Sequence, residues 1–176
     1  WLCHPMRRIT DVRLPQHKGI PHETNFFSIL LDDQDIVTSI AQIEPGAISP
    51  GESWEGDWIS PMGLDLQING GLGLCFSELS YKDLPNLNAL LERLWSDGVE
   101  AICPTIISCD KSALRQSLSV IKKARIDLKP KRCELLGAHL EGPFIAPERR
   151  GAHPLEYLSE PSLCALDQRI RGFENE

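Results

Sequence analysis

From residue 59 onward the chain alternates between predicted strands and predicted helices, and no other feature constrains its fold as strongly. The ranges 59–69, 99–107 and 131–140 are apolar or β-branched runs that predict strands. Between them, residues 84–95 and 114–124 carry apolar side chains at helical spacing. This order is typical of βαβ units around a parallel sheet. The sequence therefore predicts an α/β fold with about three βα units.

The helices also have predictable ends. The pattern Ser80-x-x-Asp83 is a capping box that would open the first helix, and Asp110 would cap the second. Ser159 could cap a final short helix that ends at Gly172. We expect these three helices to connect or follow the three strands.

The first 58 residues show a different, strand-rich pattern. Two β-branched or apolar runs, 26–31 and 36–43, are joined by the polar segment 32–35, which suits a hairpin. The stretch 44–57 is dense in proline and glycine and indicates an irregular connection. We therefore predict a β-rich N-terminal part over residues 1–58 and an α/β part over residues 59–176.

Composition and charge exclude several classes of protein. The formal charge is −7 and no stretch is rich in Lys or Arg, which argues against nucleic acid and anionic membranes as partners. No apolar run is long enough for a membrane span, and no signal peptide is recognisable. The six cysteines are scattered without a CxxC pair, as in reduced proteins of the cytoplasm. We expect a cytoplasmic protein whose partner is a small molecule or another copy.

Polar side chains gather where two predicted strands end. Asp65, Gln67 and Asn69 alternate with apolar residues, so they would share one face of the first strand. Two interpretations stay open, a polar site at the end of a buried strand and a half-exposed strand with a solvated face. His139 and Glu141 likewise share a face at the end of the third strand, where parallel barrels place their metals.

Four segments together resemble a known family. They are SPMGLDLQINGG at 60–71, GVEAICPT at 98–105, AHLEGPF at 138–144 and RGAH at 150–153. In this order and spacing they are similar to N-acetylglucosamine-6-phosphate deacetylase of the amidohydrolase superfamily, over roughly residues 55–158. The resemblance implies the first part of a (β/α)8 TIM-type barrel, preceded by part of a small β-sandwich. Because a closed barrel of this kind takes about 250 residues, the chain would contain an incomplete one.

The resemblance also implies a chemistry and a metal site. Family members hydrolyse the acetamide of N-acetylglucosamine 6-phosphate to glucosamine 6-phosphate and acetate, with a divalent metal such as Zn²⁺. Glu141 matches the family's metal-ligand glutamate, and a carboxylate suits such an ion. Gln67 and Asn69 replace the His-x-His of many superfamily members, and neutral amides are poor zinc ligands, so we expect one metal ion.

The remaining residues take roles around that metal. Ala152 and His153 match a pair that contacts the amino-sugar phosphate, and His139 is expected to line the site as a hydrogen-bonded core histidine. The resemblance assigns no catalytic residue to this chain, because the family's catalytic aspartate and its two metal-ligand histidines lie on later strands. We therefore expect the chain to be inactive alone, whereas full-length family members are expected to be homo-oligomers.

Two other functions stay open. The chain could be a different amidohydrolase, such as a dihydroorotase-like enzyme, although that class usually carries His-x-His where this chain has Gln67-x-Asn69. It could also be a truncated or degenerate relative that acts as a non-catalytic binding or assembly module.

Overall fold

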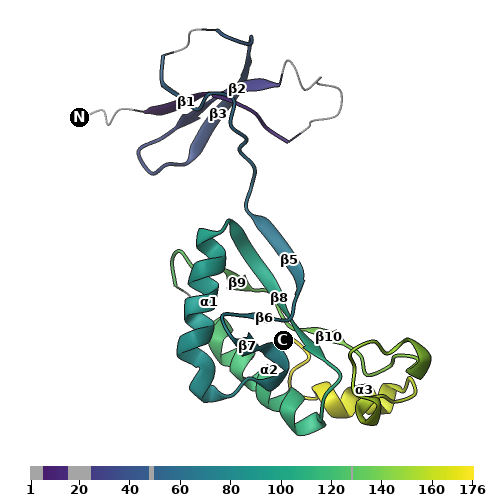
Figure 1. The fold of residues 1–176 in the computed structure, drawn as a ribbon. Helices are drawn as coiled ribbons and strands as arrows, with labels where there is room; N and C mark the ends of the chain where they lie inside the picture. The colour runs from purple at the N-terminus through teal and green to yellow at the C-terminus, as the bar shows by residue number, and fades with distance from the viewer. Residues whose placement is uncertain (1–5, 16–24, 48–49, 128) are drawn as a thin grey trace. The chain divides into compact units, whose positions relative to one another are not determined.

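The computed structural model describes residues 6–15, 25–47, 50–127 and 129–176 (Figure 1). The chain divides into two compact units, Trp1–Pro61 and Met62–Glu176. The first is β-rich, and the second is a mixed α/β unit that contains all the helices of the described residues. In the part of the chain that the structure describes, no helix is long and apolar enough to cross a membrane.

A four-stranded sheet forms the first unit. Its order is β3-β2-β1-β4, with bounds Val37–Ile43, Phe26–Leu31, Arg7–Val12 and Glu52–Ser53. The predicted hairpin is confirmed, since β2 and β3 pair antiparallel. Asp32 stabilises its turn because Oδ1 accepts hydrogen bonds from the backbone N–H groups of Gln34 and Ile36, both at 2.9 Å.

The second unit is built around a central parallel strand, β8 (Val99–Ile107). Strand β5 (Gly63–Ile68) pairs with it on one side, and β9 (Glu134–Leu135) and β10 (His139–Glu141) pair with it on the other. The predicted parallel sheet is therefore present. Its helices are α1 (Leu84–Ser96), α2 (Lys111–Ile126) and α3 (Leu163–Ile170).

Short elements complete this unit. The strands β6 and β7 form a small hairpin after β5, and four 3-10 turns, η2 to η5, lie in the connections. Their bounds are Gly70–Gly71, Leu74–Cys75, Phe76–Glu78, Tyr81–Asp83, Pro147–Arg149 and Leu155–Tyr157.

The two faces of β8 have different surroundings. Ile102 and Ile106 belong to the buried core that α1 and α2 complete with their leucines (Figure 1). Because side chains alternate along a strand, Thr105 points to the opposite face, where its hydroxyl meets His139. The helix-covered face thus holds the core, and the other face is available for a site. Leucine, isoleucine and valine residues dominate that core: Leu87, Leu90, Leu91, Ile102, Ile106, Leu114, Leu118, Val120, Ile121 and Leu135.

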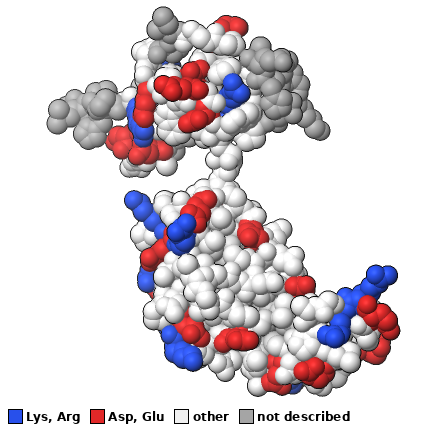
Figure 2. All heavy atoms as spheres, in the orientation of Figure 1, with Lys and Arg blue, Asp and Glu red and all other residues white. Residues whose placement is uncertain are grey.

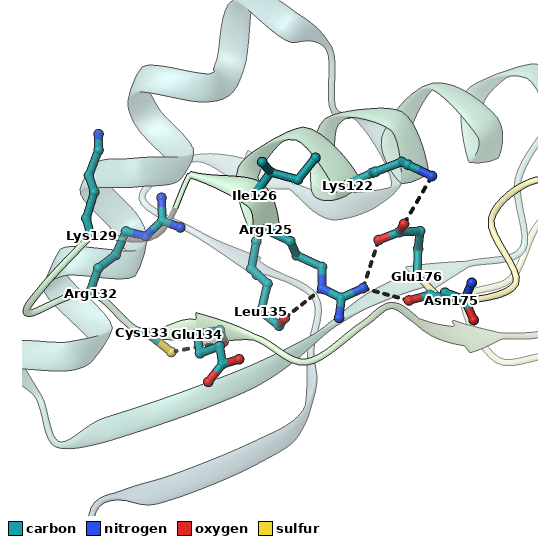
Figure 3. A pocket seen from close by; sticks show the side chains of 10 residues that line it. All are labelled: Lys122, Arg125, Ile126, Lys129, Arg132, Cys133, Glu134, Leu135, Asn175 and Glu176. Carbon is teal, nitrogen blue, oxygen red and sulfur yellow. Dashed lines mark hydrogen bonds and ion pairs between the residues drawn. The ribbon is translucent and has the colours of Figure 1, made fainter.

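The third predicted strand, 131–140, is interrupted. The prediction of one continuous strand is wrong, because the chain leaves the ladder after Leu135 and rejoins it at His139. Arg125 of α2 contacts this break (Figure 3), where its Nε donates to the Leu135 carbonyl at 2.9 Å and its Nη1 donates to the Glu176 carboxylate at 2.8 Å. Gly137, between the two pieces, has φ +149°, a conformation that favours glycine.

The predicted helix caps are confirmed for α2 and differ for α1 and α3. The Asp110 carboxylate accepts from the backbone N–H of Ser112 at 2.8 Å and caps α2, as predicted. The Ser80 and Asp83 capping box is present, but it opens the 3-10 turn η3, and α1 follows at Leu84 without a side-chain cap bond from Asp83. The last helix is capped by Ser162 and not by Ser159, as its hydroxyl accepts from the N–H of Ala165. The N–H of Ser159 is instead used in a loop bond to the carbonyl of Pro143.

Strand β5 lies at an edge of the sheet and is less regular than its sequence predicts. Its pairing with β8 shifts register between Gly63 and Leu64 and again between Asp65 and Ile68. Leu64 and Leu66 are 60% and 63% exposed. The strand is therefore half-exposed, but not as expected for a solvated polar face, because its exposed residues include two leucines while Asp65 is half-buried. Gln67, at its end, reaches the site described below.

Charged side chains are interspersed on the surface. The face seen in Figure 2 carries acidic and basic groups side by side over both units. Several basic groups are already paired with carboxylates, among them Arg7 with Glu52, Arg93 with Asp97 and Arg171 with Asp167. Such exposed pairs contribute little to stability.

Burial of α1 predicts a large difference between two identical substitutions. Leu91 is fully buried, so Leu91→Ala should lower the free energy of unfolding by about 2–5 kcal/mol. Leu163, at 86% exposed, is the matched control, and Leu163→Ala should change it by less than about 0.5 kcal/mol. Urea unfolding followed by far-UV circular dichroism measures both, and equal effects would contradict the packing of α1.

The cap of α2 predicts a pH dependence. Hydrogen bonds from the hydroxyl and the backbone N–H of Ser112 hold the pKa of Asp110 below its ordinary value. Because the pKa is lower in the folded chain, this stabilisation is present above the unfolded pKa, about 3.9, and is lost as the pH falls through the folded pKa. Wild type should be more stable than Asp110→Asn at neutral pH, and the gap should close under acid. Asp33→Asn, in an exposed turn, should show no such gap.

Candidate functional site

Glu141 lies at the centre of a polar cluster where the parallel strands end. It is the last residue of β10, in register with Ile107, the last residue of β8. Its side chain is 33% exposed and both of its oxygens have partners. Oε2 accepts from Gln67 Nε2 at 3.3 Å, and Oε1 lies 3.3 Å from His153 Nε2. The structure thus brings together residues from three of the four segments on which the resemblance rests.

His153 is held from several directions and is only 6% exposed. Its Nδ1 lies 2.9 Å from Ser108 Oγ and 3.3 Å from the backbone nitrogen of Ser108. Arg150 fixes the backbone, because its Nη1 donates to the His153 carbonyl at 2.8 Å. The imidazole therefore contacts Ser108 through Nδ1 and Glu141 through Nε2.

Gly142 allows this close approach. It has φ +94°, which favours glycine, and an added Cβ would lie 2.1 Å from Ser108 Oγ and 3.4 Å from His153 Nδ1. A side chain at this position would therefore occupy the space between the end of β8 and the imidazole. The position of Gly142 therefore requires glycine for two reasons, the positive φ of the turn and the lack of space for a side chain.

The other expected site residues lie around this cluster. His139 is half-buried and its Nδ1 lies 3.1 Å from the hydroxyl of Thr105, as expected of a hydrogen-bonded core histidine. Asn69 and Ala152 are exposed, and among the described residues no hydrogen bond joins either of them to Glu141. Asp65 accepts from the backbone N–H of Gln67 at 3.0 Å and so helps to set its conformation.

Sequence reasoning missed Thr105 and Ser108, the two buried hydroxyl groups that contact the imidazoles. Thr105 lies within the apolar strand β8 and Ser108 directly follows it, where a small hydroxyl residue is common in a turn. The one signal in the sequence was their position at the end of a strand next to the strand that carries Glu141. Their partners lie far along the chain, so no local pattern pairs them.

The residues present fit a divalent ion only in part. Glu141 offers a carboxylate, which suits such an ion, whereas Gln67 is a neutral amide. Within the described ranges, no group of three or more His, Cys, Asp or Glu side chains could hold a metal ion. Because a metal site usually needs about three protein ligands, the described residues do not complete one.

The fold and site define an α/β protein whose parallel sheet ends where a partly exposed carboxylate meets a buried imidazole, and a β-rich unit precedes this sheet in the sequence. Solved structures share this fold. The structure of N-acetyl-D-glucosamine-6-phosphate deacetylase from Mycobacterium smegmatis, a mutant in complex with N-acetyl-D-glucosamine-6-phosphate, aligns with a TM-score of 0.64 over 95% of this chain and 40% of its own length. Its sequence identity is 18%. The likeness therefore shows the fold.

Sequence comparison gives the family resemblance. The chain is 37% identical to N-acetylglucosamine-6-phosphate deacetylase of Danio rerio over 101 residues, 57% of this chain and 24% of that protein. It is 31% identical to N-acetylgalactosamine-6-phosphate deacetylase of Escherichia coli O157:H7 over 144 residues, 80% of this chain and 37% of that protein. No family model matches the chain. The chain thus resembles the N-terminal portion of N-acetylglucosamine-6-phosphate deacetylases, as the sequence predicted, and spans well under half the length of these relatives.

The contact at Gly142 predicts a strong effect of one methyl group. Gly142→Ala should displace Ser108 or His153 and lower the free energy of unfolding by roughly 1–3 kcal/mol more than the control. Gly151→Ala is the matched control, because Gly151 also has a positive φ, +57°, but an added Cβ would meet nothing within 4 Å. Urea unfolding and the imidazole NMR resonances of His153 measure both effects, and equal behaviour of the variants would contradict the contact.

Proposed function

We propose that this chain supplies part of the active site of a metal-dependent deacetylase that acts on an N-acetylhexosamine 6-phosphate. The reaction is hydrolysis of the acetamide to a free amine and acetate. The observation that carries the proposal is the junction of Gln67, Glu141 and His153, which come from three separated segments of the family pattern and meet through 3.3 Å contacts. Chance similarity of short motifs would not bring them to one point.

Glu141 is the proposed ligand of a single divalent ion. Its carboxylate is partly exposed, so an ion can reach it. Because Gln67 presents an amide at the position where a second metal would need a histidine, one ion is favoured over two. The further ligands and the general base that the family uses are expected beyond the segments matched here, so we propose that these 176 residues do not hydrolyse the substrate alone.

His153 and Ala152 are the proposed contacts to the sugar phosphate. Ala152 is exposed and directly precedes the buried His153. A ligand can therefore contact the backbone of Ala152 while the ligand accepts a hydrogen bond from the imidazole of His153. Relatives are named for both the gluco and the galacto epimer, so the substrate class is proposed as N-acetylhexosamine 6-phosphate. We also propose a cytoplasmic location, and association with further copies as the full-length family would imply.

Ligand titration of the purified chain tests this proposal. N-acetylglucosamine 6-phosphate should shift the amide NMR resonances of Ala152 and His153, and glucose 6-phosphate, which lacks the acetamide, should shift them less. His153→Gln should weaken binding by up to about tenfold, the effect of one hydrogen bond of ~1.4 kcal/mol, whereas Glu156→Gln, at an exposed position, should not.

An acetate-release assay with added Zn²⁺, with and without chelator, is run beside the titration. We expect no acetate from the chain alone. Chelator-sensitive release would contradict the incomplete site, and unchanged resonances of Ala152 and His153 at saturating ligand would contradict the assignment of the sugar phosphate to this segment.

A further inference from the structure

We propose that Ser108 is a positioning residue that fixes the tautomer of His153, so that the proton of the neutral ring is on Nε2. The imidazole then presents an N–H donor to the site and not a lone pair. This assignment rests on the contacts within the chain, and its consequence for ligand recognition rests on the proposed function.

The backbone of Ser108 determines the tautomer. Its N–H lies 3.3 Å from Nδ1 of His153 in a geometry that makes Nδ1 the acceptor, and a backbone N–H can only donate. A neutral imidazole carries one proton, so an Nδ1 that accepts leaves the proton on Nε2. The hydroxyl of Ser108, 2.9 Å from the same nitrogen, can add a second and shorter bond to it.

The opposite side of the ring agrees with this assignment. Nε2 lies 3.3 Å from Glu141 Oε1, and an ionised carboxylate can only accept a hydrogen bond. A proton on Nε2 therefore satisfies both ends of the ring, whereas a proton on Nδ1 would face the N–H of Ser108 and leave two acceptors opposed at Glu141. Both Ser108 and His153 are buried, at 4% and 6% exposed, so solvent does not replace these bonds.

Two further features hold Ser108 in place. The backbone N–H of Ile107, the preceding residue, donates to Ser77 Oγ at 3.0 Å and fixes the end of β8. The absence of a side chain on Gly142 leaves the space in which Ser108 Oγ lies. Ser108 is therefore positioned before any ligand arrives.

The consequence is a defined role for His153. With Nδ1 engaged by Ser108 and a proton on Nε2, neither nitrogen offers a free lone pair to a metal ion. The ring is instead a donor, which Glu141 Oε1 accepts in this structure and which a carbonyl, hydroxyl or phosphate oxygen of a ligand could accept in place of Oε1. Because of Ser108, His153 acts as a hydrogen-bond donor, whereas Glu141 provides the acceptor oxygens.

NMR of the full 176-residue chain, with ¹⁵N-labelled histidine, chelator and mildly alkaline buffer, tests the tautomer without substrate or metal. Long-range ¹H–¹⁵N correlation should show Nδ1 of His153 as an unprotonated nitrogen and Nε2 as a protonated one. In Ser108→Ala the bond from the hydroxyl is lost while the backbone N–H stays, so the Nδ1 resonance should shift but remain that of an unprotonated nitrogen.

Ser117→Ala is the matched control. Ser117 is equally buried, but its hydroxyl has no hydrogen-bond partner among the described residues, so its removal should leave the His153 resonances unchanged. A proton on Nδ1 in wild type, or resonances unchanged by Ser108→Ala, would overturn the proposal. Should Ser108→Ala fail to fold, the wild-type spectrum alone decides the tautomer. None of these outcomes depends on deacetylation, so the proposed function can fail separately.

Discussion

The pairing of β10 with β8 is the constraint on which the site depends. It sets His139 beside Thr105 and Glu141 beside Ile107, at the end of the parallel sheet. From Glu141 the chain turns at Gly142 directly against Ser108, and the loop that follows returns His153 to the same point. Three contacts of the site therefore follow from one register, because a slip by one residue would place Glu141 on the helix-covered face.

The two faces of strand β8 have different functions, one in packing of the core and one in the polar site. Its residues Ile102 and Ile106 complete the apolar core under α1 and α2, whereas Thr105 and Ser108 offer hydroxyl groups to the two imidazoles. The core stabilises the strand by burial of apolar area, and a rigid strand end can hold buried polar groups at fixed distances. Arg125 contributes from the other side, since its bonds to Leu135 and to the Glu176 carboxylate tie α2 to the strand that leads into β10 (Figure 3).

The described residues form only part of the metal site that the proposed function requires. One partly exposed carboxylate, one amide and one buried imidazole meet, but the described residues provide no set of three metal ligands. This agrees with the extent of the similarity, since the chain spans 24% of the Danio rerio deacetylase and 37% of the Escherichia coli protein. A single carboxylate binds an ion weakly, so the proposed function requires metal ligands in addition to Glu141.

The sequence by itself determined the secondary-structure elements whose signals come from residues close together in the chain. Helical spacing placed α1 and α2, the Asp110 cap fixed the start of α2, and the apolar run 99–107 placed β8, because these signals are local. Only the tertiary structure decided the break before β10, where Arg125 of α2 bonds to the Leu135 carbonyl, and the irregular edge strand β5. It also decided the contact of Ser108 with His153, 45 residues later, because a hydrogen bond between distant segments requires the register of the whole sheet.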